Sequence, residues 1–314
     1  TWEQEYRRQR SAILGQEPLI AGERNRILSG KVSTMLAKAG ATHGAAKVKR
    51  GVSVHQSSTA PSPQDGLVVW VRDGFQESEP AVIKDIQQRS VEDATIHVLI
   101  PKAESDRIKN AIASDLAATG TLHSKGTPST EEGKDARKSI EAKQRAAEAA
   151  VDDASDAILS KARVFLSGGQ EITSSGLLED VRTAATNVLG RLYPKFAMAD
   201  HASWQVVWKK AKEGNADALA SAGYKGDADK HPVAVELLRH IGAGKKGSEI
   251  HEVFEGGSYG WPSDAIDAVL GVLMVTGHVS ARSGSGAAAL SDLDQRKIKQ
   301  AEFRVQHPVL TAPQ

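Results

Sequence analysis

Six cationic side chains are the residues of this 314-residue chain whose type and spacing best suit a chemical role. They fall into two groups, Lys47, Lys49 and Arg50 near the N-terminus and Lys245, Lys246 and Arg282 in the last third. Lysine and arginine bind phosphate oxygens and release the counterions that surround nucleic acids. The six residues therefore predict contacts with nucleic-acid phosphates. The alternative is an ordinary solvated surface, which is what a run of charges usually forms.

Motifs for a nucleotide or metal site are incomplete. A P-loop needs G-x-x-x-x-G-K-[ST], but the two Gly-Lys pairs continue as GKK at 244–246 and GKV at 30–32. The segment HEVFE at 251–255 lacks the second histidine of a zinc protease. Asp73 ends an apolar run, as a magnesium-binding aspartate would, but Asp-Gly favours a turn. We predict no catalytic, cofactor-binding or metal-binding residue.

The composition is that of an ordinary globular chain with a neutral total charge. It has 40 Lys and Arg against 39 Asp and Glu, and 40% of its residues are hydrophobic. Residues 1–60 are basic, with 10 cations against 4 anions, and residues 61–160 are acidic, with 12 against 18. The absence of cysteine excludes disulfides, Cys-ligated metals and thiol chemistry, and it suits the cytoplasm, where we expect the protein.

Neither end of the sequence predicts a membrane or export signal. No run approaches the roughly 20 apolar residues that span a bilayer. The charged N-terminus has no apolar core of a signal peptide, and it begins with Thr1 instead of Met. We expect no membrane partner, and we expect the chain to be an internal piece of a longer protein.

The clearest element pattern is a βαβ unit. The apolar run at 67–71 predicts a buried strand, the helical spacing at 80–90 a helix, and the run at 95–100 a second strand. Such a unit implies two parallel strands with a right-handed crossover. Further predictions are a broken helix over 1–40, a strand at 47–55 and a helix at 102–119. A capping-box pattern at 129–132, with Ser129 as the N-cap, predicts a long helix that reaches to about Lys161. A hairpin is predicted at 163–173, and helices are predicted at 175–192, 200–213 and 215–222.

The last third follows the winged-helix pattern. Helices are predicted from His231, over 248–254 and from Trp261 to Val275, followed by a strand at 278–282. Groove recognition of DNA needs Arg, Lys, Asn or Gln on the third helix, and residues 256–281 contain none of them. A protein-binding role is therefore favoured for this module. Leu270 and Leu273 should be buried on the third helix.

The predicted fold class is mixed α/β and mainly helical, with three domains. Residues 1–125 form a basic helical arm plus an α/β domain that contains the βαβ unit. Residues 126–230 hold the long helix, the short hairpin and a helical region. Residues 231–314 form the winged-helix-like domain and a C-terminal tail.

A series of short motifs resembles one family of defence proteins. In order they are LVVWVRDG (67–74), TIHVLIPK (95–102), GTPSTEEG (126–133), ARVF (162–165), RLYPKF (191–196), ADHASW (199–204), GDADKHPV (226–233), IGAGKK (241–246) and YGWPSDAID (259–267). This series, within 43–305, resembles the BrxC/PglY family of P-loop proteins from bacteriophage-exclusion (BREX) and phage-growth-limitation systems.

The resemblance implies a part in anti-phage defence, beside a DNA methyltransferase and an alkaline-phosphatase-like protein. It places ATP and magnesium in an upstream ATPase module that this chain lacks. We therefore expect a non-catalytic scaffold region that contacts other BREX proteins, a second copy of itself and, non-specifically, DNA. Two alternatives stay open: a nucleic-acid-binding winged-helix module, and part of an ATPase site that missing sequence completes.

Overall fold

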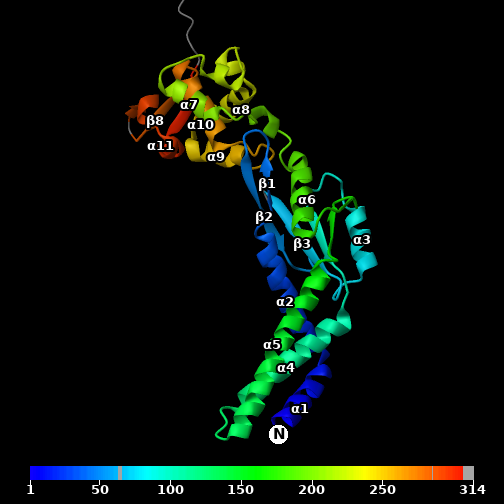
Figure 1. Cartoon of the computed structure of the whole chain (residues 1–314). Helices are drawn as coiled ribbons and strands as arrows, with labels where there is room; N and C mark the ends of the chain where they lie inside the picture. The colour runs from blue at the N-terminus through cyan, green and yellow to red at the C-terminus, as the bar shows by residue number, and fades with distance from the viewer. Residues whose placement is uncertain (63–65, 285, 307–314) are drawn as a thin grey trace, which may run out of the picture. The chain divides into compact units, whose positions relative to one another are not determined.

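The computed structural model describes residues 1–62, 66–284 and 286–306, and it divides the chain into two compact units. The first unit comprises residues 1–40 and 51–185, and the second comprises 41–50 together with the residues from 186 onward. Figure 1 shows the helices and strands of both units, coloured along the chain. The predicted domain boundary at 125/126 falls inside the first unit, because the long helix that follows it packs against the helix before it.

The βαβ unit is confirmed in the first unit. Strand β3 (Leu67–Asp73) pairs in parallel with β4 (Ile96–Ile100), and helix α3 (Glu79–Gln88) connects them. Both strands are almost wholly buried, as their continuous apolar runs predict for a sheet covered on both faces. Val82 and Ile86 of α3 pack with Leu99 and Phe165.

This pair lies in the middle of a six-stranded sheet with the strand order β1-β2-β3-β4-β5-β6. Strand β2 pairs in parallel with β3, whereas β4, β5 and β6 pair antiparallel. The predicted hairpin at 163–173 is confirmed as β5 and β6. The remaining strands of the sheet are β1 (Gly40–His43), β2 (Val48–His55), β5 (Arg163–Leu166) and β6 (Glu171–Ile172).

Four helices complete the first unit: α1 (Trp2–Leu14), α2 (Glu17–Leu36), α4 (Ser105–Lys125) and α5 (Glu131–Leu159). The predicted break in the N-terminal helix occurs at Gly15, just before the chain restarts with Pro18 in the first turn of α2. Helix α5 begins one residue later than predicted, since Thr130 and not Ser129 is its N-cap, and residue N3 is Gly133. The capping box is therefore absent. Helices α1 and α5 both pack against α4.

The second unit is mainly helical. Its elements are α6 (Leu177–Leu192), which contains the unit boundary, η1 (Phe196–Ala199), α7 (Trp204–Lys212), η2 (Ala218–Ala222), η3 (Ala228–Lys230), α8 (Pro232–Ile241), α9 (Gly247–Glu255), α10 (Ser263–Val275), η4 (Leu290–Asp292) and α11 (Gln295–Gln300). The three predicted helices from His231 onward correspond to α8, α9 and α10. A single cluster of buried side chains runs through α7, α8, α9 and α10.

A four-stranded antiparallel sheet covers this cluster with the strand order β7-β10-β8-β9. Its strands are β7 (Lys245–Lys246), β8 (Val279–Ser283), β9 (Gly286–Ala288) and β10 (Glu302–Val305). Strand β8 was predicted from the sequence. Strands β7 and β10 were not, because two and four residues are too few to show an alternating pattern.

Candidate nucleic-acid interface and a polar cavity

All six predicted phosphate-binding residues belong to the second unit. This unit carries 18 Lys and Arg against 14 Asp and Glu, so it is the more basic of the two. The fold joins the two groups of cations in one unit although about 200 residues separate them in the sequence. Within the unit they occupy two places, the tip of the β1–β2 hairpin and the β7-β10-β8 sheet.

The hairpin tip is held by a carboxylate from a distant segment. Asp200 Oδ1 accepts a hydrogen bond from the backbone N–H of Ala46 at 2.8 Å, and a Cβ at Gly44 would overlap the same carboxylate. His43 stacks on Phe196 with ring centroids 3.5 Å apart. Lys47 and Lys49 are exposed at this tip, where they can reach phosphates.

Arg50 has a different environment from its two neighbours. Its guanidinium lies 4.3 Å from the ring centroid of Tyr193, and its Nη2 donates to the carbonyl of Gly260. Burial lowers the pKa of Arg50. Because its guanidinium already makes these contacts, Arg50 fastens the hairpin tip to the rest of the second unit. Of this group, Lys47 and Lys49 therefore remain the candidates for phosphate contacts.

The sheet places Lys246 and Arg282 in one cross-strand row. Both pair with Glu302 of β10, Lys246 from β7 and Arg282 from β8. Side chains of directly paired residues lie on the same face of a sheet. The carboxylate of Glu302 therefore lies between the two cations, and it also bonds Arg304 at 3.0 Å. Lys245 pairs instead with the buried Phe303 and is half-buried.

Helix α10 is covered on every side. Its nine consecutive residues from Ala265 to Leu273 are all buried, which confirms the expected burial of Leu270 and Leu273. Trp208 of α7 packs against Gly271, so this tryptophan contributes to packing on α10. At the N-terminal end of α10, Asp264 accepts hydrogen bonds from Gln205 and Gln295. A helix in this environment cannot enter a DNA groove.

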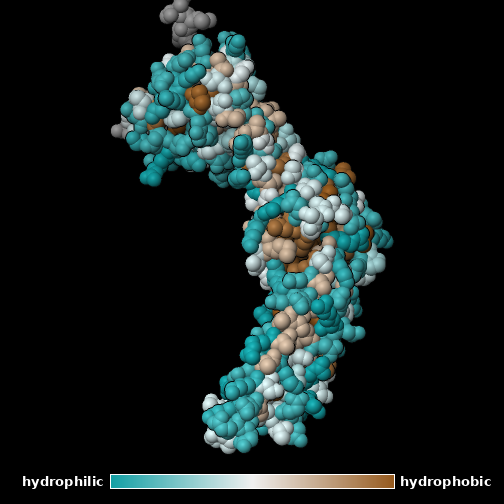
Figure 2. Space-filling view, in the orientation of Figure 1, coloured by the Kyte–Doolittle hydropathy of each residue, from teal (hydrophilic) through white to brown (hydrophobic). Residues whose placement is uncertain are grey.

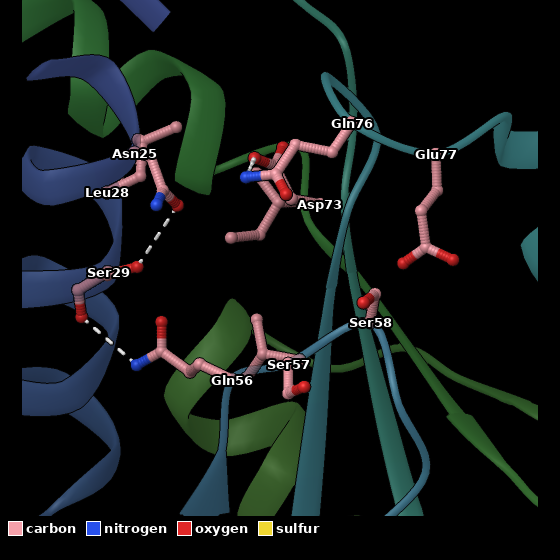
Figure 3. Close-up of a pocket in the computed structure, with 11 residues that line it drawn as sticks. Asn25, Leu28, Ser29, Gln56, Ser57, Ser58, Asp73, Gln76 and Glu77 are labelled. Atoms are coloured by element: carbon pink, nitrogen blue, oxygen red, sulfur yellow. Dashed lines mark hydrogen bonds between the residues drawn. The ribbon is translucent and has the colours of Figure 1, made fainter. Parts of the chain in front are cut away.

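The first unit contains a small polar cavity at the carboxyl ends of β2, β3 and β4, the edge at which parallel sheets commonly bind ligands. Its volume is about 110 Å³. Figure 3 shows polar side chains pointing into it from α2 and from the segments that follow β2 and β3. The labelled side chains are Asn25, Leu28, Ser29, Gln56, Ser57, Ser58, Asp73, Gln76 and Glu77.

The chemistry of this cavity does not suit a nucleotide. None of its lining residues that the structure describes is Lys or Arg, so phosphates would meet only carboxylates and neutral groups. Asp73 Oδ1 accepts from the N–H of Phe75 at 2.9 Å, which confirms the predicted turn, and burial raises its pKa. Glu77 is paired with Arg72, whose Nε lies 2.7 Å from Glu77 Oε1.

The described ranges contain neither a metal-binding cluster nor a membrane-spanning helix. In residues 1–62, 66–284 and 286–306, no three His, Asp or Glu side chains form a group that could hold a metal ion. Across these ranges, each helix is too short or too polar to cross a lipid bilayer.

Two features of the second unit escaped sequence reasoning. Asp200 anchors the hairpin tip from more than 150 residues away, and nothing in its local sequence marks it. His251 and Asp267 form a buried pair between α9 and α10. The helical spacing around His251 could have indicated that it faces inward, since Ile250 and Phe254 are also buried.

Comparison with known proteins adds no relative: no family model matches the chain, and neither a curated protein nor a solved structure is significantly similar to it.

Proposed function

We propose that this chain is a non-catalytic scaffold region of a BREX-type anti-phage ATPase, which binds partner proteins and touches DNA only through phosphates. The observation that carries the proposal is the burial of nine consecutive residues of α10. The third helix of a winged helix reads bases when its exposed face enters the major groove. A third helix without an exposed face leaves protein binding as the better role for the module.

The strand order supports a winged-helix assignment for the second unit. Three helices, α8, α9 and α10, come before β8 and β10, and β10 lies between β7 and β8 in the sheet. The order of first, third and second strand is the arrangement expected when a winged helix closes its sheet. Residues 286–301 would then belong to an enlarged wing that carries β9 and α11.

The surface supports protein contacts. Among the described residues, six large hydrophobic side chains are notably exposed, and four of them, Met198, Val206, Val235 and Val253, belong to the second unit. On the face drawn in Figure 2, brown patches interrupt a mostly hydrophilic surface. These four side chains are the apolar anchors that a protein interface on the second unit would use.

A direct binding experiment tests the scaffold role. The purified chain is mixed with the BREX methyltransferase or the phosphatase-like protein, each treated with nuclease to remove bridging DNA, and complex formation is followed by analytical ultracentrifugation. The proposal predicts a stoichiometric complex with at least one of the two. Sedimentation of every mixture as separate components, at concentrations of tens of micromolar, would contradict it.

The nucleic-acid-binding alternative is favoured by one observation, the row of Lys246 and Arg282 on the sheet. The intervening Glu302 weakens this row as a phosphate site, because a carboxylate repels phosphate. The polar cavity at the carboxyl ends of β2, β3 and β4 argues against the ATPase-fragment alternative. Its described lining residues include no Lys or Arg that could bind phosphates.

A further inference from the structure

The second unit contains two buried histidines in opposite environments. His231 is the N-cap of α8, where its Nδ1 accepts from the N–H of Val233 at 3.2 Å, and no carboxylate pairs with it in the described residues. Burial lowers the pKa of His231 to about 4, so its ring is neutral at physiological pH. His251 of α9 is just as buried, but both of its ring nitrogens face carboxylates.

The contacts of His251 require a proton on each ring nitrogen. Its Nε2 lies 2.9 Å from Asp267 Oδ1 of α10, and its Nδ1 lies 2.6 Å from Glu255 Oε1. A neutral imidazole carries one N–H, so it could donate to only one of the two carboxylates. The imidazolium form satisfies both. Loss of its proton would leave one carboxylate against a nitrogen lone pair.

Asp267 makes this arrangement sensitive to charge. It is 1% exposed, and its Oδ2 has no hydrogen-bond partner, so the histidine supplies its main compensation. Burial raises the pKa of Asp267. A buried carboxylate that loses its one cationic partner is an uncompensated charge in a medium of low dielectric constant.

The other charged and polar groups around this site could replace only part of the charge compensation that His251 provides. From α11, Lys299 Nζ lies 3.4 Å from Glu255 Oε1, on the exposed side of the cluster. From α10, Ser263 Oγ lies 3.2 Å from His251 Nδ1, and Asp264 bonds the two glutamines described above. Glu252 of α9 is exposed. Lys299 can compensate Glu255 but does not bond Asp267.

We propose that His251, Asp267 and Glu255 form a proton-dependent clamp that holds α9 against α10 and loosens when His251 is deprotonated. The clamp is independent of the scaffold role proposed above. One proton leaves His251 for solvent when the clamp opens as the pH rises above 6.5. The effect should appear at α9 and the following residues 256–262, whose Trp261 stacks on Phe254 with ring centroids 4.8 Å apart.

The direction of the pH effect follows from the contacts. Burial alone would lower the pKa of His251, but the hydrogen bonds to Asp267 and Glu255 raise it above its usual 6.5. The stability contributed by the proton on His251 is therefore fully present below pH 6.5. Between pH 6.5 and the raised pKa, the closing constant of the clamp falls by about tenfold per pH unit, because opening releases one proton.

Two measurements on the full chain test this proposal. In the first, histidine ring nitrogens labelled with ¹⁵N are followed by NMR from pH 5 to 9. The proposal predicts that His251 is doubly protonated at pH 6.5 and titrates above it, while His231 stays neutral. A His251 ring that is already neutral at pH 6.5 would overturn it. This measurement needs no variant.

In the second measurement, hydrogen exchange of 247–262, corrected for the intrinsic effect of pH, is compared between variants. The wild type and His231→Gln, the matched buried-histidine control, should lose protection as the pH rises from 6.5 to the raised pKa of His251, by up to about tenfold per pH unit. His251→Gln should show constant protection over the same range. A wild-type profile without a slope, or the same slope in His251→Gln, would overturn the clamp.

Discussion

Gly271 of α10 packs directly beneath the indole of Trp208 in α7: a Cβ at position 271 would lie 3.0 Å from ring carbon Cζ3. This contact covers one side of α10, whose residues 265–273 are all buried. Glycine here lets the indole approach the helix backbone closely. Helix α7 therefore packs closely against α10 at this position.

Enlarging Gly271 tests this packing. Gly271→Leu should lower the free energy of unfolding by about 1–3 kcal/mol, because its side chain has no room beneath Trp208. The double variant with Trp208→Ala should lose less than the sum of the two single losses, since removal of the indole makes room. Urea unfolding of the four proteins measures the coupling. Strict additivity would show that the two residues do not share the space.

Introducing a charged side chain into α10 tests whether this helix is buried. Leu270→Asp should destabilise the second unit by about 3–5 kcal/mol, because the carboxylate would be buried without a partner. Val206→Asp on α7 is the matched control, since Val206 is 48% exposed and should change stability by at most about 0.5 kcal/mol. Thermal melting is the measurement. Equal melting of both variants would mean that α10 faces solvent.

The loss of folding stability at acidic pH should depend on Glu255. The hydrogen bond from His251 lowers the pKa of Glu255 from 4.5 to about 2. The carboxylate therefore contributes stability that is fully present above pH 4.5 and is lost as the pH falls towards 2. Chemical denaturation between pH 2 and 6 should show a shallower acid decline for Glu255→Gln than for the wild type. If the free energy of unfolding of both proteins fell equally with pH, protonation of Glu255 would not be coupled to unfolding.

Nucleotide binding should be absent from the isolated chain. The P-loop is missing from the sequence. The described residues that line the polar cavity at the carboxyl ends of β2, β3 and β4 include no Lys or Arg. Calorimetric titration with Mg-ATP should give no affinity tighter than millimolar, and hydrolysis should stay at background. Micromolar binding in this titration would reinstate the ATPase-fragment alternative.

The sequence predicted the elements that have strong local patterns. The continuous apolar runs at 67–71 and 95–100 identified the parallel strands of the βαβ unit, and the helical spacing of buried residues identified α8 and α10. The short strands β7 and β10 lack such a pattern. They pair with each other across more than 50 residues of chain, Glu302 with Lys246 and Phe303 with Lys245. Only the tertiary fold brings these segments together.

The candidate site was harder to predict because burial decides the role of each cation. Lys47, Lys49 and Arg50 are equivalent in the sequence, yet Tyr193 and Gly260 engage only Arg50. These partners lie more than 140 residues away, so no local pattern announces them. Likewise, His251 and Asp267 lie on different helices, and only their packing makes them a pair.

The central claim, that the second unit contacts DNA through phosphates and not through base edges, is tested most directly by fluorescence anisotropy on two unrelated duplexes over a salt series. The account predicts equal, weak binding to both, with Kd on the order of 10⁻⁴–10⁻⁶ M at physiological salt. Lys47→Ala with Lys49→Ala should flatten the slope of log K against log salt by about two. Tight binding to one duplex that survives high salt would contradict the account, as would no binding to either at low salt.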